Sequence, residues 1–143
     1  MRRERVLQLL HQVGLDERHA RSVPRQLSSG QCQRVAIARA LIPGPTLLVL
    51  DEAVSALDVS IQGQILNLLG DIRRETGISY VFISHNLAVV RQVTDELIVM
   101  RNGQVLEAGP TARVLDAPRE PYTQLLRASV PGPGWTPRRA GTR

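Results

Sequence analysis

The segment between residues 47 and 84 restricts the fold of this chain more than any other part of the sequence. It begins with Leu47-Leu48-Val49-Leu50, an apolar run too short for a helix and typical of a strand covered on both faces of a parallel sheet. Apolar residues then recur at helical spacing, at positions 61, 65, 68, 69 and 72, up to Gly77. Residues 78–84 (ISYVFIS) predict a second strand. This order predicts a right-handed parallel crossover, and therefore an α/β fold.

Side chains that can bind ligands or move protons follow both predicted strands. Asp51 and Glu52 come directly after the first strand, and His85 follows the second. Open α/β sheets bind ligands at the carboxyl ends of their strands, where one carboxylate can hold a metal ion and its neighbour can address a water molecule. The alternative is structural, because acids also cap a following helix and a lone histidine is often structural. If the two strands are neighbours, His85 lies beside the carboxylates.

A small-residue turn, LSSGQ at residues 27–31, precedes another predicted helix. This helix extends from Gln31 to Ile42, where Pro43 follows, and its apolar residues cover nearly the whole circumference, which predicts packing on several sides. Ser28 or Ser29 could cap the helix by accepting a hydrogen bond from a free backbone N–H. Alternatively, hydroxyls and N–H groups at the positive end of the helix dipole could bind a phosphate. The turn alone leaves both interpretations open.

The remaining sequence predicts short elements. Asn102-Gly103 lies between two alternating segments and indicates a hairpin, because this pair accepts positive φ at both turn positions. The expected elements are helices at residues 4–13 and 86–93, strands at 96–100 and 104–107, and helices around 114–115 and 122–126. Residues 131–143 have the composition of a disordered tail.

The composition excludes several functions. All 18 basic residues are arginines, so the lysine-bearing phosphate loop of P-loop enzymes is absent from this chain. Aromatic residues make up only 3%, and the arginines are scattered, so we expect no nucleic-acid partner. The single cysteine, Cys32, excludes an internal disulfide and a multi-cysteine metal cluster. No apolar run is long enough to span a bilayer and no secretory leader is recognisable, so we expect a cytoplasmic chain.

Four landmarks occur in a specific order: LSSGQ at 27–31, LLVLDE at 47–52, SALD at 55–58 and a strand-ending histidine at 85. Together they resemble the second half of the nucleotide-binding domain of ATP-binding cassette (ABC) ATPases. The resemblance covers about residues 5–130 and implies a P-loop NTPase-type parallel sheet of the ABC ATPase class, incomplete because the P-loop strand is absent. Residues 51–69 and 109–131 look most like the ATPase subunits of peptide and nickel importers.

The resemblance implies a role for each landmark. Ser28, Ser29, Gly30 and Gln31 would form the signature loop, which meets the γ-phosphate of ATP bound to the opposite subunit of a head-to-tail dimer. Asp51 would help to hold Mg²⁺, Glu52 would be the general base, and His85 would contact the γ-phosphate. The interface loop that couples the two sites would consist of Ser55, Ala56, Leu57 and Asp58.

The resemblance also implies cofactors, partners and a domain plan. ATP and Mg²⁺ are the expected cofactors, and the expected partners are a second nucleotide-binding subunit and transmembrane permease subunits, at the cytoplasmic face of the cell membrane. Residues 1–42 would belong to the helical subdomain, 43–109 to the second half of the ATPase core with its terminal hairpin, and 110–130 to importer-type C-terminal helices. The expected activity is ATP hydrolysis that drives uptake of peptides or related solutes.

Three departures from the family pattern qualify this expectation. Serine replaces the usual glycine at Ser29, which would cost about 1 kcal/mol if the position needs a positive φ. Glu120 replaces the histidine that usually precedes Pro-Tyr. The family's first half, with its P-loop, adenine-stacking aromatic and glutamine loop, is missing, so we expect no activity from this chain alone. Two alternatives stay open: a non-catalytic half-domain that lends its signature loop to an intact ATPase, and a non-transport ABC ATPase.

Overall fold

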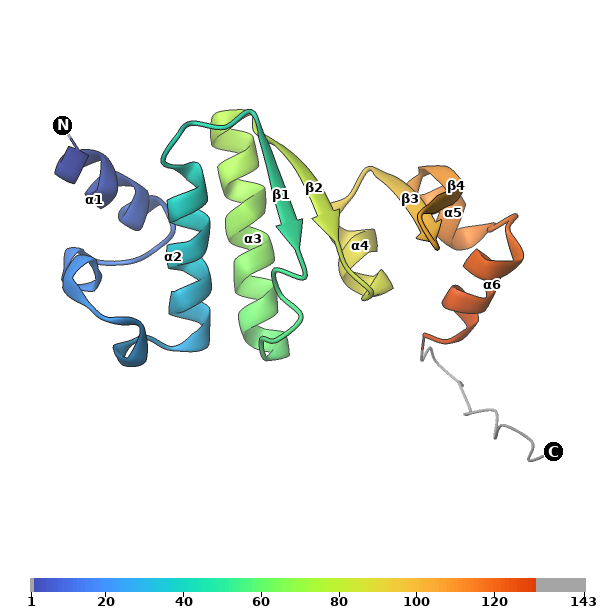
Figure 1. The fold of residues 1–143 in the computed structure, drawn as a ribbon, viewed down its shortest axis with the longest axis horizontal. Helices are drawn as coiled ribbons and strands as arrows, with labels where there is room; N and C mark the ends of the chain where they lie inside the picture. The colour runs from blue at the N-terminus through green and yellow to red at the C-terminus, as the bar shows by residue number, and fades with distance from the viewer. Residues whose placement is uncertain (1, 131–143) are drawn as a thin grey trace. The chain divides into compact units, whose positions relative to one another are not determined.

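The structure, a computed structural model, describes residues 2–130 except for the side chain of Arg2. The predicted disordered tail at 131–143 lies outside the described residues. Contacts divide the chain into two compact units, one ending at His85 and the other beginning at Asn86, and each is described by itself (Figure 1). The boundary between these units falls within residues 43–109, the segment that the sequence assigned to the second half of the ATPase core. No helix within residues 2–130 is long and apolar enough to cross a membrane.

The first unit contains the predicted strand–helix–strand arrangement. Strands β1 (Leu47–Asp51) and β2 (Ser79–Ile83) are joined through helix α3 (Val59–Thr76) and pair in parallel, with Leu47 opposite Ser79 and Asp51 opposite Ile83. Gly77 ends α3 in the left-handed conformation at φ 70°. The other elements of this unit are α1 (Arg2–Gln12), the 3-10 turns η1 (Glu17–Arg21) and η2 (Pro24–Gln26), and α2 (Ser29–Leu41). The predicted α/β fold with a parallel strand pair is confirmed.

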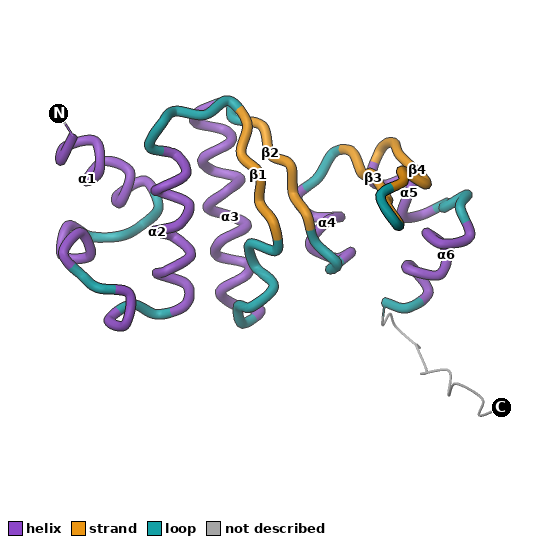
Figure 2. Tube along the Cα trace, viewed as in Figure 1, coloured by secondary structure: helices purple, strands orange, loops and turns teal. Residues whose placement is uncertain are grey.

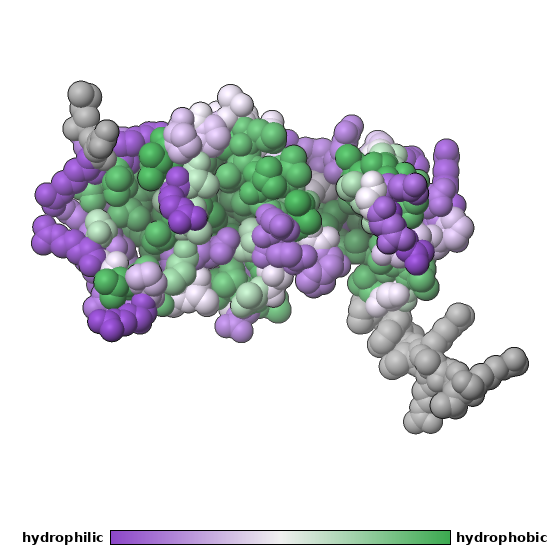
Figure 3. All heavy atoms as spheres, viewed as in Figure 1, coloured by the Kyte–Doolittle hydropathy of each residue, from purple (hydrophilic) through white to green (hydrophobic). Residues whose placement is uncertain are grey.

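The β1–β2 pair is covered on one face within this unit. Leu48 and Leu50 are buried, and the Tyr80 hydroxyl on the same face donates to the carbonyl oxygen of Leu69 on α3 at 2.9 Å. The alternate residues Leu47 and Val49 are 51% and 58% exposed, and Figure 3 shows hydrophobic residues gathered on the visible surface over these strands. The prediction that the first strand is covered on both faces was therefore wrong within the described unit, because its helices supply only one layer.

Helix α2 begins two residues earlier than the sequence predicted and packs on fewer sides. Its fully buried positions are Gly30, Ile37, Ala38 and Leu41. A Cβ atom at Gly30 would lie 2.8 Å from Cγ2 of Ile61, so the first turn of α2 approaches the beginning of α3 closely. Arg34 fixes the middle of α2 by donating to the carbonyl oxygen of Val13 at 2.7 Å.

The second unit consists of short elements around an antiparallel hairpin (Figure 2). These are α4 (Leu87–Val93), β3 (Glu96–Arg101), β4 (Gln104–Pro110), α5 (Thr111–Asp116) and α6 (Pro121–Ala128). Asn102 and Gly103 have φ angles of 51° and 76°, and Arg101 pairs with Gln104 across them. The predicted hairpin turn is confirmed.

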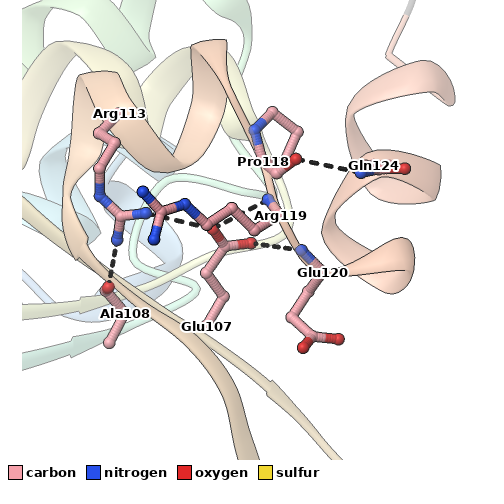
Figure 4. Close-up of polar contacts among 7 residues, drawn as sticks. All are labelled: Glu107, Ala108, Arg113, Pro118, Arg119, Glu120 and Gln124. Atoms are coloured by element: carbon pink, nitrogen blue, oxygen red, sulfur yellow. Dashed lines mark hydrogen bonds and ion pairs between the residues drawn. The ribbon is translucent and has the colours of Figure 1, made fainter.

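A buried carboxylate ties the hairpin to helix α6 (Figure 4). The two oxygens of Glu107 accept from the backbone N–H groups of Arg119 and Glu120, each at 3.2 Å, and Arg113 lies 3.5 Å away. Burial alone would raise the pKa of Glu107, but these hydrogen bonds and the arginine outweigh it and hold the pKa below its ordinary value. Glu120 contributes its backbone to this contact, so the unusual side chain at this position leaves the hydrogen bond possible.

Candidate functional site

The LSSGQ loop is the N-terminal cap of helix α2. Ser28 has extended backbone angles, and its hydroxyl oxygen accepts from the backbone N–H of Gln31 at 3.2 Å. In return, the side-chain oxygen Oε1 of Gln31 accepts from the backbone N–H of Ser28 at 2.9 Å. This reciprocal pair is a capping box. The structural interpretation of this turn is therefore confirmed for Ser28, and its hydroxyl proton can still be donated to another group.

The same turn also offers donors to an anion. The N–H groups of Ser29 and Gly30 lie in the first turn of α2, where no preceding helical carbonyl can accept them. Among residues 2–130, the structure shows no other backbone acceptor for these two groups. Ser28 and Ser29 are exposed, and the positive end of the helix dipole lies here. Capping and phosphate binding are thus compatible at this turn.

Ser29 and Gly30 have different local requirements. Within residues 2–130, the residues other than glycine that have positive φ are Glu52 and Asn102, so Ser29 is in an ordinary helical conformation. The conformational cost considered for serine at this position does not arise. Gly30 also has an ordinary φ, but its missing Cβ leaves the space that Ile61 occupies. The glycine is explained by this close approach.

Glu52 lies in a strained turn at the carboxyl end of β1. Its φ angle is 48°, which is unusual for a residue with a side chain and costs on the order of 1 kcal/mol. Its backbone N–H donates to the carbonyl oxygen of Ile83 at 3.0 Å, one step beyond the last paired residue of β1. This bond holds the turn against the end of β2.

His85 lies beside Glu52, as expected for neighbouring strands. Its Nδ1 atom is 2.9 Å from Oε1 of Glu52, and the side chains are 79% and 40% exposed, respectively. The hydrogen bond from His85, and then its charge, hold the pKa of the Glu52 carboxyl below its ordinary value. Because a carboxylate can only accept, Nδ1 carries the proton in this contact. His85 can therefore donate to a phosphate through Nε2 only as the doubly protonated imidazolium.

Asp51 is the remaining acid of this rim and lies on the exposed end of β1. With Glu52 it lines a recess of about 220 Å³ between β1 and α2. No group of three or more potential ligand side chains close enough to hold a metal ion occurs in the described part of the chain. Mg²⁺ usually takes one or two protein carboxylates together with substrate phosphates and water. One carboxylate with open space beside it fits that requirement.

The loop after Glu52 is fixed at both ends. The Ser55 hydroxyl donates to the carbonyl oxygen of Glu52 at 2.9 Å, and Gln62 of α3 donates to the carbonyl oxygen of Leu57 at 2.9 Å. Between them, Val54 is buried, whereas Ser55, Ala56 and Asp58 are exposed. The predicted interface loop thus presents its side chains outward from a defined backbone. Sequence reasoning missed the contact of Ser55 with Glu52, although their three-residue spacing is typical of a tight turn.

The structure brings some predicted residues together and separates others. Glu52, His85, Asp51 and the Ser55 turn share one rim at the strand ends. No hydrogen bond joins the LSSGQ residues to Asp51, Glu52 or His85 anywhere in residues 2–130. The first unit therefore carries two separate polar regions, called here the loop (residues 27–31) and the rim (Asp51, Glu52, Ser55 and His85). Sequence reasoning also missed His19, which contacts the loop.

The sequence of this chain is similar to those of ABC transporter proteins. A family model described as ABC transporter matches residues 1–55. Glutathione import ATP-binding protein GsiA of Salmonella choleraesuis (strain SC-B67) is 52% identical over 128 residues, which is 90% of this chain and 20% of the relative. The protein of the same name from Pectobacterium atrosepticum is 51% identical over 128 residues, again 90% of this chain and 20% of the relative. The chain thus spans about a fifth of the length of these curated relatives.

The fold of this chain is also similar to those of solved ABC transporter cassettes. The ADP conformation of MJ1267, an ATP-binding cassette of an ABC transporter, matches with a TM-score of 0.69 and 27% identity, over 85% of this chain and 49% of that one. The dimeric structure of MJ0796, a bacterial ABC transporter cassette, matches with a TM-score of 0.64 and 36% identity, over 76% and 46%. About half of such a cassette is therefore represented by the described fold.

Proposed function

We propose that this chain, which belongs to the family of ABC transporter ATP-binding subunits, is the ATP-hydrolysing half of a cassette that energises import. The contact between Glu52 and His85, at the ends of two adjacent parallel strands, carries the proposal. It joins a carboxylate and a proton-carrying ring at the edge where α/β sheets bind ligands. The names of the relatives support glutathione and related peptides as the solute class.

The rim would place an attacking water. Glu52 is ionised at neutral pH because its pKa lies below the ordinary value, so its carboxylate accepts a hydrogen bond from water and orients it. His85 holds that carboxylate through Nδ1. As the imidazolium, it would also have the Nε2–H group available to donate to a phosphate oxygen. Asp51 would hold Mg²⁺, which when bound with ATP neutralises phosphate charge. Positioning and charge compensation are the main requirements of phosphoryl transfer.

The loop would act on a different nucleotide from the rim. Its free N–H groups, the Ser28 hydroxyl and the helix dipole suit an oxygen of a phosphate. Within residues 2–130 no hydrogen bond joins the loop to the rim, which leaves the loop available to ATP bound to a second subunit. The dimer formed by the structural neighbour MJ0796 supports the same arrangement. We further propose that Ser55 to Asp58 cross this subunit interface, and that permease subunits place the assembly at the cytoplasmic face of the membrane.

Complementation tests the proposal. The chain is co-purified with the preceding part of a GsiA-type cassette, which supplies a P-loop, and Mg²⁺-dependent ATP turnover and nucleotide binding are measured. We expect turnover from the mixture, and expect Glu52→Gln to abolish it while nucleotide binding changes little. Equal loss of binding and turnover would give Glu52 a structural role.

The same experiment examines the half-domain alternative. In that case the chain would stimulate an intact cassette only through its loop. Stimulation that survives Glu52→Gln but is lost with Ser28→Ala would favour this alternative over catalysis at the rim.

A further inference from the structure

We propose that Gln62 is a positioning residue, which fixes the interface loop (Ser55 to Asp58) by holding the backbone of Leu57. Gln62 is half-buried on helix α3 and lies beyond the SALD sequence. Its side-chain Nε2 donates to the carbonyl oxygen of Leu57 at 2.9 Å. The consequence for the contact between subunits rests on the proposed function, whereas the hydrogen bond itself can be tested in the isolated chain.

The direction of this hydrogen bond follows from its acceptor. The carbonyl oxygen of Leu57 can only accept, so the part of the Gln62 amide that faces it is the NH₂ group. The backbone N–H of Gln62 donates to the carbonyl oxygen of Asp58 at 2.8 Å, at the beginning of α3. One residue therefore binds the last two carbonyl groups of the interface loop, one through its side chain and one through its backbone.

The beginning of the interface loop is fixed without Gln62, but its end is not. The N–H and the hydroxyl of Ser55 both donate to the carbonyl oxygen of Glu52, at 3.2 and 2.9 Å, and the N–H of Leu57 donates to the carbonyl oxygen of buried Val54 at 3.2 Å. Within residues 2–130, no second hydrogen bond to the carbonyl oxygen of Leu57 is seen. Loss of the Gln62 donor would leave this half-buried carbonyl group without a partner, which favours a rearrangement of the backbone.

The residue before Gln62 approaches the loop at residues 27–31. A Cβ atom at Gly30 would lie 2.8 Å from Cγ2 of Ile61, so this side chain packs against the first turn of α2. The beginning of α3 thus anchors both segments that the proposed function directs to a second subunit, one through packing and the other through a hydrogen bond. A change at Gln62 should therefore alter the interface loop and leave residues 27–31 in place, which provides an internal control.

Gln62→Glu is the most informative variant, because it retains the size of the side chain and removes the donor. An ionised carboxylate can only accept, so it cannot bind the carbonyl oxygen of Leu57. The dipole of α3 favours a negative charge near its N-terminus, which offsets part of the lost stability. Gln64→Glu is the matched control, because it makes the same charge change on the same helix and keeps an oxygen acceptor for Arg34. Gln62→Met removes the donor without adding a charge and serves as the second variant.

Proton–nitrogen NMR of the isolated chain tests the hydrogen bond. We expect the Gln62 side-chain NH₂ group to exchange with solvent more slowly than that of Asn67, which is exposed on the same helix. Both Gln62 variants should move the backbone amide signals of residues 55–58 and speed their exchange, whereas the signals of residues 27–31 should stay in place. Gln64→Glu should leave both segments unchanged. Unchanged signals at 55–58 in the Gln62 variants, or a Gln62 NH₂ group that exchanges as fast as that of Asn67, would overturn the proposal.

The complemented cassette gives the functional result, when ATP turnover is measured against protein concentration. In both Gln62 variants we expect the concentration for half-maximal turnover to rise about fivefold, the factor that corresponds to one ordinary hydrogen bond. Maximal turnover should change little, because the rim is intact, and Gln64→Glu should match the unaltered chain.

The remaining outcomes separate this proposal from the proposed function. A lower maximal turnover at an unchanged half-maximal concentration would contradict the role of Gln62 at the subunit contact. If the unaltered cassette shows no turnover, the proposed function fails, and the NMR result still decides whether Gln62 holds the interface loop. Unchanged NMR signals together with full turnover would reject the role of Gln62 and leave the proposed function standing.

Discussion

The loop and the rim are both polar regions at the ends of regular elements, but they are built in opposite ways. The bonds that fix the loop join residues 16–31, and its backbone is unstrained. The rim joins Glu52 to His85 across 33 positions, and Glu52 has a positive φ. A locally built region depends on its own sequence, whereas the rim depends on the register of two strands. The following changes test this difference, from the largest expected effect to the smallest.

Gly30 is where the loop depends on packing. Gly30→Ala would place a Cβ atom 2.8 Å from Ile61, so we expect the free energy of unfolding to fall by about 1–3 kcal/mol. Gly63 on α3 is the matched control, because a Cβ atom there meets nothing within 4 Å. Gly63→Ala should be neutral or stabilising by up to about 1 kcal/mol. Chemical denaturation measures both, and equal effects at the two positions would refute the close approach of α2 and α3.

Ser28 is where the loop depends on its own cap. Ser28→Ala removes the acceptor for the Gln31 N–H, so we expect a loss of about 1 kcal/mol of stability. Ser29→Ala is the control, since no side-chain hydrogen bond of Ser29 is seen within residues 2–130, and it should change stability by less than about 0.5 kcal/mol. Thermal unfolding of the pair checks this. A larger effect at Ser29 would mean that the cap is assigned to the wrong serine.

Substitution by glycine tests the difference in backbone strain between the rim and the loop, because Glu52 has a positive φ and Ser29 does not. Glu52→Gly relieves a positive φ and should stabilise the chain by up to about 1 kcal/mol while removing the proposed base. Ser29→Gly places glycine where the family usually has it, yet it relieves nothing, because Ser29 has an ordinary helical conformation. Its stability should stay equal or fall slightly. Stabilisation by Ser29→Gly with none from Glu52→Gly would contradict the claim that the rim is strained and the loop is not.

The smallest expected effect is the pH dependence of the rim. The pKa of Glu52 is lowered in the folded chain, so its contact adds stability above the unfolded pKa of glutamate, and this is lost as pH falls through the folded pKa. Glu52→Gln should flatten that acid-side loss slightly, because both side chains are exposed to solvent. Carbon-13 NMR of the Glu52 carboxyl group measures the titration directly. A midpoint above the ordinary value for glutamate would contradict the contact with His85.

The two regions also differ in how far the sequence could predict them. The serine cap and the Asn102-Gly103 turn follow from local backbone chemistry, and the strand–helix–strand order follows from hydrophobic periodicity. The contact of Glu52 with His85 could be expected once the strands were assumed to be neighbours. The positive φ of Glu52 could not be predicted, because it arises where the chain leaves the paired strand end. Neither could the contact of His19 with Gln31, since an irregular 3-10 turn has no periodic signal.

The most direct test of this account is Mg²⁺-dependent ATP turnover by the purified 143-residue chain alone. The chain carries the loop and the rim but no lysine to hold the β- and γ-phosphates. We therefore expect turnover indistinguishable from that of a blank, and turnover that depends on Glu52 once a P-loop segment is supplied. Steady turnover by the chain alone, abolished by Glu52→Gln, would contradict the account.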